Sequence, residues 1–406
     1  MLSSLSVIES ADMLKRYLMA CLAGGVLFII YLLLKTSSFA IGSVPKAVVT
    51  RTEDSNVMSK TGSLFDEPAT TTTEVDINLY SIRNPHLGPL FNISHDNIIN
   101  FKHYPYWNSS FTFRQNSNWK NSTCTESLQK KAFTSKDFGQ IFRPDIQMLI
   151  NSDLFDVNEY RRLKRWTIPY GYEYRGRSIM YEEVGDTLKM FPSEDSIFKV
   201  SREGQTDCIS CAVVGNGGIL NGSRMGKEID EHDFVFRVNQ AYTRGYEDDV
   251  GSRTTHFVFF DRSLTLMKLE HYPVGQNITY IFVPCREADY SYLRTIGNGT
   301  NVFKAPPENV RVIHPDFMRY VHFVWMRVDS FRPTTGGIMT MVALHACDKL
   351  SLYGMGYNYK YSNHYFDTRY QEFLPVLLSH DHTREIKLWD TLDKEGIVYW
   401  YRRDVF

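Results

Sequence analysis

Two short apolar runs in this chain end on asparagine, and these amides are the first candidates for binding chemistry. The segment Cys211-Ala-Val-Val-Gly-Asn-Gly-Gly218 joins a buried-strand pattern to three glycines that allow a tight turn. The segment Asp233-Phe-Val-Phe-Arg-Val-Asn239 ends in the same way. In an open α/β sheet, nucleotides bind at the carboxyl ends of the strands. Asn216 and Asn239 therefore predict a site for a ribose, a base or a single phosphate.

A dinucleotide-binding fold is an alternative for the first segment. Gly215-Asn-Gly217 begins like the G-x-G-x-x-G fingerprint, but Leu220 stands at the position of the third glycine. No acidic residue closes a short strand about 20 residues further on. A glycine-rich turn alone is equally compatible with a structural role, so the downstream segments decide between these interpretations.

Further polar segments follow in a fixed order. They are His314-Pro-Asp-Phe-Met-Arg-Tyr320, Pro333-Thr-Thr-Gly336, Leu344-His-Ala-Cys-Asp348, His364-Tyr-Phe-Asp367, and His380 with Glu385 in the spacing H-x-x-x-x-E. Together with the first segment, they resemble the large, small, third and very small sialylmotifs of animal sialyltransferases. The resemblance extends from about Cys208 to Trp389. It implies a single Rossmann-like α/β glycosyltransferase domain that uses CMP-sialic acid as its donor.

Resemblance to particular subfamilies of sialyltransferases indicates which glycosidic linkage the transferred sialic acid would form. Cys211–Arg224, Arg332-Pro-Thr-Thr-Gly336 and Ser362-Asn-His-Tyr-Phe366 are similar to the alpha-N-acetylgalactosaminide α2,6-sialyltransferases. Gly251–His256 and Gly354-Met-Gly356 are closer to the galactoside α2,3 group. We therefore expect transfer, with inversion, to O6 of GalNAc in mucin-type O-glycans on glycoproteins, and keep galactoside α2,3 transfer as the alternative.

Two other classes of protein share some of these sequence features. A non-catalytic Golgi glycan-binding protein could keep the fold, but the retained His380 and His364 argue against it. A soluble nucleotide-dependent oxidoreductase is disfavoured by the missing third glycine and by the N-terminal features described below.

The reaction needs one general base. CMP departs as a stable anion, whereas the acceptor hydroxyl must lose a proton, and histidine is the commonest base near neutral pH. By resemblance His380 is the candidate base, placed before a helix expected to begin near Thr383, and Glu385 supports this segment. His382 is the competitor, although it does not fit the H-x-x-x-x-E spacing.

The resemblance also implies the donor contacts. His364 would contact the phosphate of CMP, where an N–H donor offsets developing charge. Thr335 and Gly336 would offer a hydroxyl and backbone N–H groups at a helix N-terminus, which is a natural anion site, although an ordinary threonine cap is the alternative. Gly354 and Gly356 would line the cytidine side.

Neither a metal nor a cofactor is expected. Glu247-Asp248-Asp249 lacks the Asp-x-Asp spacing of metal-dependent glycosyltransferases, and we interpret it as a structural loop before Val250-Gly251. No carboxylate pair of the glycosidase kind stands out. The formal net charge of -1 gives no indication of a nucleic-acid partner.

The N-terminal part predicts a membrane protein. Tyr17–Leu34 is 18 residues without a charge, near the lower length limit for a spanning helix, and a signal peptide is the alternative. We expect a cytosolic tail over 1–16, a signal-anchor over 17–34, a largely disordered lumenal stem over 35–115 and a catalytic domain over 116–406. This is a single-pass type II protein of the Golgi membrane.

Glycosylation sequons and cysteines support a lumenal location. Sequons begin at Asn92, Asn108, Asn121, Asn221, Asn277 and Asn298. Five cysteines follow the anchor, so an oxidising compartment would leave two bridges and one thiol. Cys208-Ile-Ser-Cys211 alone is open to zinc or redox interpretations, but no second C-x-x-C completes a zinc site. The family resemblance implies the pairs Cys124–Cys208 and Cys211–Cys347, with Cys285 as the free, buried thiol.

Alternating patterns predict an α/β sandwich with a mainly parallel sheet. The expected strands are Ala212–Val214, Phe234–Val238, His256–Phe260, Tyr280–Val283, Val310–Ile313 and Leu350–Tyr353. The expected helices are Asp145–Leu163, Asp316–Val328, Gly337–Ala346 and Thr383–Lys394.

Overall fold

The computed structural model describes residues 113–174, 176–199, 208–265, 267–326, 332–356, 360–368 and 380–403. The predicted tail and anchor, the stem up to residue 112, and the sequons at Asn92 and Asn108 lie outside the described residues. Within these ranges, no helix combines the length and apolar character needed to cross a membrane.

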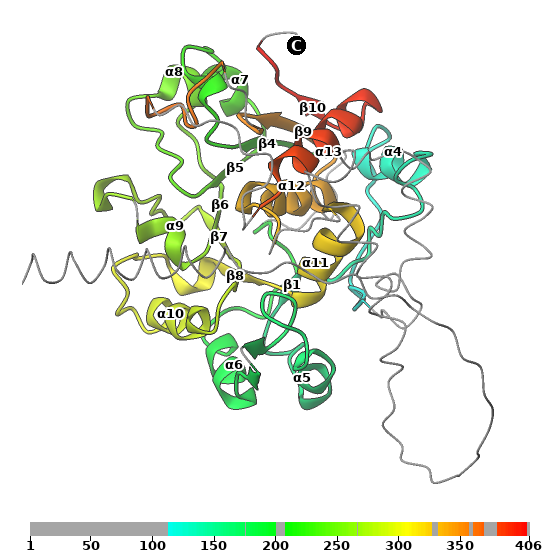
Figure 1. The fold of residues 1–406 in the computed structure, drawn as a ribbon, viewed down its shortest axis with the longest axis vertical. Helices are drawn as coiled ribbons and strands as arrows, with labels where there is room; N and C mark the ends of the chain where they lie inside the picture. The colour runs from blue at the N-terminus through cyan, green and yellow to red at the C-terminus, as the bar shows by residue number, and fades with distance from the viewer. Residues whose placement is uncertain are drawn as a thin grey trace, which may run out of the picture. The chain divides into compact units, whose positions relative to one another are not determined.

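An eight-stranded sheet forms the centre of the described domain (Figure 1), in the order β1-β8-β7-β6-β5-β4-β9-β10. The strands are β1 (Leu149–Ile150), β4 (Ser210–Val214), β5 (Phe234–Val238), β6 (His256–Phe259), β7 (Thr279–Phe282), β8 (Val310–Ile313), β9 (Lys349–Tyr353) and β10 (Tyr399–Trp400). All neighbours pair in parallel except β1, which runs antiparallel to β8. The predicted mainly parallel α/β fold is confirmed. Strands covered on both faces are mainly apolar, which is why these segments were recognisable in the sequence despite single polar residues such as Arg237 and Arg311.

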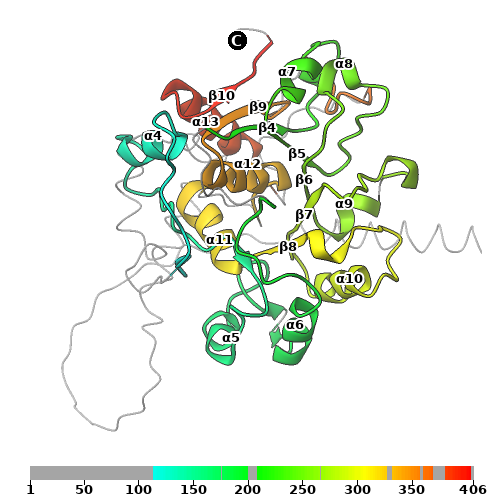
Figure 2. The ribbon, with the colours of Figure 1, turned by 180° about the vertical axis from the view of Figure 1, so that it is seen from behind.

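Helices and a small hairpin connect and cover the strands (Figure 2). They are α4 (Leu128–Thr134), α5 (Val157–Leu163), α6 (Tyr181–Leu188), α7 (Gly226–Asp230), α8 (Glu247–Val250), α9 (Asp261–Thr265), α10 (Ala288–Gly297), α11 (Pro315–Arg319), α12 (Thr335–Ala346) and α13 (His382–Lys394), with the hairpin β2 (Glu173–Tyr174) and β3 (Arg177–Ser178). The 3-10 turns are η3 (Gly218–Leu220), η4 (Leu269–His271) and η5 (Pro307–Asn309), and η6 (Tyr320–Met326) is a π-helix.

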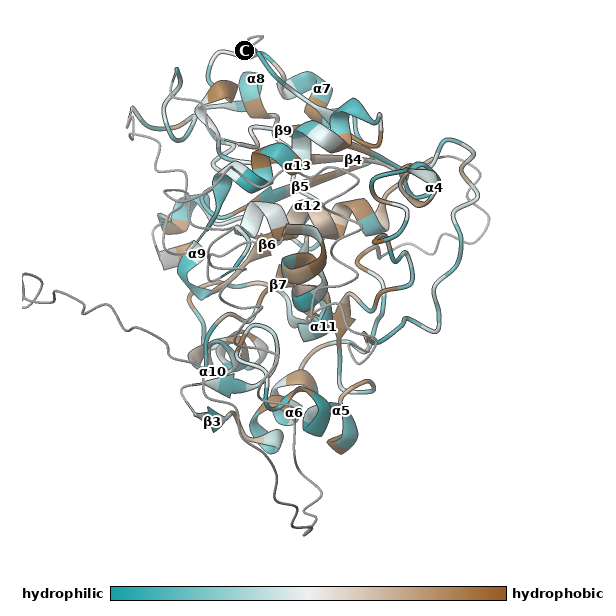
Figure 3. Ribbon diagram, turned by 45° about the vertical axis from the view of Figure 1, so that its right-hand side comes forward, coloured by the Kyte–Doolittle hydropathy of each residue, from teal (hydrophilic) through white to brown (hydrophobic). Residues whose placement is uncertain are grey.

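Helix α12 is the central helix of the domain. It packs against β4, β5, β6 and β9, and all of its residues except Gly336 are buried. A helix that is apolar all round belongs in a core. Outer helices such as α6 and α7 instead carry hydrophilic residues (Figure 3). The N-terminus of α12 is thereby fixed relative to the ends of β4 and β9.

Two predicted helices were wrong in their extent. Of the helix expected over Asp145–Leu163, only α5 is helical, and Leu149–Ile150 is the strand β1 instead. After β1, the side chain of Asn151 accepts hydrogen bonds from the backbone N–H groups of Asp153 and Leu154 at 3.1 and 3.0 Å. Polar side chains that bind the backbone in this way compete with helix formation. The helix expected over Asp316–Val328 is α-helical only to Arg319 and continues as the π-helix η6 to Met326.

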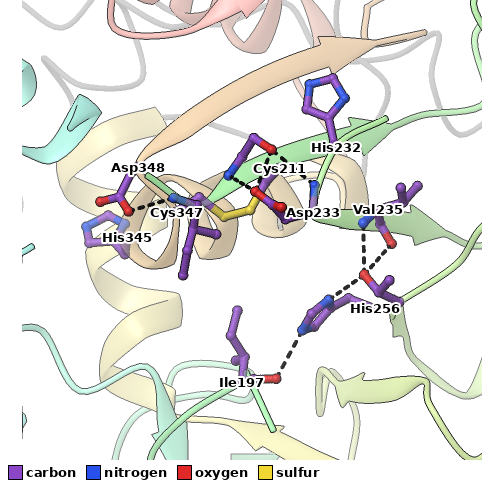
Figure 4. The surroundings of a disulfide bond; sticks show 12 residues. Ile197, Cys211, His232, Asp233, Val235, His256, His345, Cys347 and Asp348 are labelled. Carbon is purple, nitrogen blue, oxygen red and sulfur yellow. Dashed lines mark hydrogen bonds between the residues drawn. A yellow bond between two sulfur atoms is a disulfide. The ribbon is translucent and has the colours of Figure 1, made fainter. Parts of the chain in front are cut away.

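Two disulfides stabilise the sheet and its central helix. Cys124 pairs with Cys208, and Cys211 on β4 pairs with Cys347 at the end of α12 (Figure 4). These are the pairs that the family resemblance implies. Cys285 is buried and outside any disulfide, and burial raises the pKa of its thiol to about 12. A thiol with so high a pKa is unreactive near neutral pH.

Candidate active site

A pocket of about 110 Å³ lies where β4, β5 and β9 end at their carboxyl sides. Its lining residues are Gly215, Asn216, Gly217, Val238, Asn239, Thr334, Gly336, Gly354, Met355, Gly356, Asn363, His364, His382, Glu385, Ile386 and Trp389. Four of the motifs recognised in the sequence thus contribute to one cavity, although neither His314–Tyr320 nor Leu344–Asp348 is among its lining segments. Of the predicted site residues, Thr335 and His380 are not among those that line it.

Glycines bring the loops after β4 and β9 into backbone contact. The N–H of Gly215 donates to the carbonyl of Tyr353 at 2.8 Å, and the N–H of Gly217 donates to that of Gly354 at 3.0 Å. A Cβ on Gly215 or Gly217 would lie 2.5 or 2.7 Å from the carbonyl oxygen of Gly354. Gly354 itself has a φ of 62°, which favours glycine. One wall of the pocket is therefore backbone, and side chains at these positions would push it apart.

The two strand-end amides present different atoms to the pocket. Nδ2 of Asn216 donates to the carbonyl of Val238 at 3.4 Å, while its buried Oδ1 has no hydrogen-bond partner among the residues that the structure describes. Asn239 has a φ of 53° and its Oδ1 accepts from the hydroxyl of Ser263 at 2.8 Å. A ligand donor, such as a hydroxyl or amino group, would satisfy Asn216, whereas Asn239 has its amide N–H group to offer to an acceptor.

Thr334, rather than the predicted Thr335, caps helix α12. The hydroxyl of Thr334 accepts from the N–H of Gly337 at 2.8 Å and donates to the carboxylate of Glu385 at 2.5 Å. The backbone N–H of Thr334 also donates to Glu385 at 2.7 Å. The N-cap therefore lies one residue before the predicted Thr335, which is buried in the first turn of α12.

Glu385 is a buried carboxyl group at this helix N-terminus. Burial raises its pKa to about 7, although the hydrogen bonds from Thr334 oppose that shift. The carboxyl group links α13 to α12 across the pocket. The sequence indicated a supporting role for Glu385 but gave no sign of its partner, which lies 51 residues away in the chain.

Two histidines stand beside each other at the start of α13. His382 lines the pocket, and burial followed by the proximity of His380 lowers its pKa to about 4. Nδ1 of His380 lies 3.0 Å from the carbonyl oxygen of Arg332, and burial lowers the pKa of His380. The two ring centres are 5.9 Å apart. Both rings are therefore neutral at pH 7, which is the state that can accept a proton.

His364, in the segment 360–368 that follows β9, also lines the pocket. Its Nδ1 lies 2.8 Å from Oδ2 of Asp367, and its ring stacks on Phe366 with centres 5.0 Å apart. Sequence reasoning missed other lining residues, among them Met355, Asn363, Ile386 and Trp389. Each lies within or beside a recognised motif, but apolar or amide side chains in a motif give no indication of which ones face a cavity.

The small motif also contains a buried ionic cluster. Ligand atoms of Glu159, His314 and Asp316 lie within 4.8 Å of one another, as in a metal site. Arg162 pairs with Glu159 and Asp316 at 2.5 and 2.6 Å, and Arg319 also pairs with Asp316. Burial alone would raise the pKa of Glu159, but hydrogen bonds from His314 and Arg162 lower it to about 2. Because arginines already neutralise the carboxylates, the cluster holds α5 against α11 rather than binding a cation.

The acidic run before Val250 lies in the short helix α8, not in the predicted loop. Asp249 accepts backbone hydrogen bonds from Gly222 at 2.6 Å and Arg224 at 2.9 Å. These contacts indicate a structural role for the acidic run.

The four sequon asparagines that the structure describes are all exposed: Asn121, Asn221, Asn277 and Asn298.

The fold and these converging motifs define a glycosyltransferase, and comparison with known families specifies it. The chain belongs to glycosyltransferase family 29 (sialyltransferase), whose model matches residues 149–397. The alpha-N-acetylgalactosaminide alpha-2,6-sialyltransferase 1 of Gallus gallus is 36% identical over 338 residues, covering 75% of this chain and 59% of that protein. This chain therefore spans less than two thirds of the length of that relative.

Two more comparisons agree with this assignment. The alpha-N-acetylgalactosaminide alpha-2,6-sialyltransferase 2 of Mus musculus is 34% identical over 320 residues, covering 70% of this chain and 84% of that protein. A mammalian sialyltransferase solved in complex with Gal-beta-1-3GalNAc-ortho-nitrophenol superposes with a TM-score of 0.50 at 26% identity. That match covers 69% of this chain and 99% of the solved chain.

Proposed function

We propose that this protein transfers sialic acid from CMP-sialic acid to O6 of GalNAc in mucin-type O-glycans on glycoproteins, with inversion and without a metal. The observation that carries the proposal is that the large, small, third and very small motifs each contribute lining residues to one pocket at the strand ends. The small motif contributes through Thr334 and Gly336. Membership of family 29 supports the reaction class, and the α2,6 names of the relatives above support the linkage.

The pocket chemistry suits CMP. The partnerless Oδ1 of Asn216 would accept from a ribose hydroxyl or the cytosine amino group, and the amide N–H of Asn239 would donate to an oxygen of the donor. His364 would contact the phosphate. Gly336, at the N-terminus of α12, and Gly354 with Gly356, beyond β9, would line the remaining sides. No step in this scheme needs a cation to hold a diphosphate.

His380 is the proposed general base. A carbonyl oxygen only accepts, so the contact with Arg332 requires a proton on Nδ1 and leaves the lone pair of the neutral ring on Nε2. The lowered pKa keeps the ring neutral. His380 is not among the pocket-lining residues, whereas the adjacent His382 is, so His382 is the competing base.

A three-variant comparison tests this assignment. His380→Ala should lower kcat by about 10²–10⁴-fold while CMP still binds, because removal of a general base has this effect. His364→Ala should also weaken CMP binding, since its proposed target is the leaving phosphate. His382→Ala should remain nearly as active as the unaltered protein. Normal turnover in His380→Ala, with loss in His382→Ala, would reassign the base.

The linkage is tested with a glycopeptide that carries only GalNAc on Ser or Thr. Such an acceptor has no galactose, so transfer to it supports α2,6 linkage to GalNAc, and a linkage analysis of the product confirms the position. The competing function is galactoside α2,3 transfer. Activity on Galβ1-3GalNAc acceptors with a product linked only through O3 of galactose would replace the proposal with that function.

We also propose the Golgi membrane as the location, with residues 1–16 cytosolic, 17–34 spanning the membrane and 35–115 forming a lumenal stem before the catalytic domain at 116–406. The exposed sequons at Asn121, Asn277 and Asn298 are compatible with glycans on the folded domain. Digestion with a peptide:N-glycosidase should shift the mass of the protein from cells. Complete absence of N-glycans would contradict a lumenal domain.

A further inference from the structure

The carboxylate of Asp367 contacts a residue of the proposed mechanism but has no part in that mechanism so far. Its Oδ2 lies 2.8 Å from Nδ1 of His364. An ionised carboxylate only accepts hydrogen bonds, so Nδ1 must carry a proton in this contact. The His364 ring also stacks on Phe366 with an angle of 2° between the planes. The contacts with Asp367 and Phe366 therefore fix the orientation of the His364 ring, with Nε2 on the side away from Asp367.

Other contacts hold the backbone of this segment without Asp367. The N–H of Tyr365 donates to the carbonyl of Asn216 at 2.9 Å, and its buried hydroxyl donates to the carbonyl of Tyr242 at 2.5 Å. The amide of Asn221 donates to the carbonyl of Tyr365 at 2.7 Å. The hydroxyl of Ser362 donates to the carbonyl of His364 at 2.7 Å. Loss of the Asp367 carboxylate should therefore free the His364 ring and leave the segment in place.

We propose that Asp367 is a positioning residue, which holds His364 with Nδ1–H on the carboxylate and presents Nε2–H to the phosphate of the donor. This inference rests on the proposed function. A carboxylate at one nitrogen and a phosphate at the other each require an N–H group, so the ring is doubly protonated when CMP-sialic acid is bound. The imidazolium keeps both protons as the bond from sialic acid to the phosphate oxygen breaks and CMP leaves with the electron pair. Its positive charge lies beside the oxygen where negative charge develops.

The test is a double-mutant cycle in the full-length protein, with CMP affinity and transfer kinetics measured separately. Asp367→Ala should weaken CMP binding and lower kcat/KM for the donor by about 10–100-fold, by analogy with the loss of carboxylates that orient metal-ligating histidines. The KM for the acceptor should stay unchanged. In the His364→Ala background, Asp367→Ala should have less than about a twofold further effect, because the ring through which it is proposed to act has been removed.

Two further variants test whether Asp367 acts by positioning His364 or by a general effect of its charge on the protein. Asp367→Glu should recover part of the CMP affinity, since a longer carboxylate can still reach the ring. Asp186→Asn is the matched control, because the exposed side chain of Asp186 pairs with that of Lys189 at the same i,i+3 spacing outside the pocket. It should leave CMP affinity unchanged.

The proposal is overturned if Asp367→Ala binds CMP within twofold of the unaltered protein. It is also overturned if the effect of Asp367→Ala is as large in the His364→Ala background, which would indicate general disruption of the fold. CMP binding decides the role of Asp367 even if no sialic acid transfer is found. Absence of transfer by the unaltered protein would instead count against the proposed function.

Discussion

The buried carboxyl group of Glu385 should make the stability of this protein depend on pH near neutrality. Its two oxygens accept from the backbone N–H and the hydroxyl of Thr334, at 2.7 and 2.5 Å. Glu385→Gln keeps the size and one acceptor oxygen but cannot ionise. The difference in free energy of unfolding between Glu385→Gln and the unaltered protein therefore measures how much the ionisation of Glu385 destabilises the fold.

The magnitude follows from the pKa. Burial raises the pKa of Glu385 from its ordinary value of 4.5 to about 7 in the folded protein. The folded state therefore binds the proton more tightly than the unfolded state, and this contribution is fully present below pH 4.5 and lost as pH rises through 7. The rise in pKa from 4.5 to about 7 corresponds to a free energy of about 3 kcal/mol. Most of it, about 2–3 kcal/mol, should disappear between pH 5 and pH 8.

Urea unfolding of both proteins at pH 5, 6, 7 and 8, with disulfides intact, measures the effect. The free energy of unfolding of Glu385→Gln minus that of the unaltered protein should rise by about 2–3 kcal/mol across this range. Glu231→Gln is the control, because Glu231 is exposed and 3.9 Å from Lys227. A difference that is independent of pH would show that Glu385 is ionised throughout, and would refute the argument from burial.

Three further outcomes are expected. Cys211→Ser with Cys347→Ser should lower the free energy of unfolding by about 2–5 kcal/mol, whereas peptide mapping that finds a Cys208–Cys211 bridge in the unaltered protein would contradict the observed pairs. Asn216→Ala and Asn239→Gly should raise the KM for CMP-sialic acid more than that for the acceptor. Glycine is used at 239 because the φ of 53° would strain alanine, and a rise confined to the acceptor KM would argue against donor contact. Transfer should continue in EDTA, and a loss restored by Mg²⁺ or Mn²⁺ would exclude the metal-free mechanism.

The sequence predicted the strands best where burial is complete on both faces. β5 and β8 begin and end at the predicted residues, because each is a short, mainly apolar run. The one charged residue in each, Arg237 or Arg311, is buried with its apolar neighbours. The edge strands β1 and β10 escaped notice, since each has only two residues. Leu149 and Ile150 also fit a helical period, but they pair with β8, and the turn at Asn151 follows them.

The site was predictable where chemistry follows directly from position in a motif. The asparagines that follow β4 and β5 and the glycines beyond β9 were found because parallel strands end at one edge of the sheet. The contact between Thr334 and Glu385 was not predictable, since it depends on how α13 packs beside α12. Nor could the sequence tell which of His380 and His382 lines the pocket, because neighbouring positions at a helix start point in different directions.

The order in which the two disulfides can close around the start of β4 has a consequence for biosynthesis. When Cys208 is made, its partner Cys124 is already 84 residues behind it, whereas Cys211 must wait a further 136 residues for Cys347. At typical synthesis rates this delay is about 10–30 s. The same stretch of chain supplies β9, the strand that pairs with the other edge of β4. The nascent protein therefore carries an unpaired thiol beside an open strand edge, a state that favours mispairing and aggregation, until one late segment closes both.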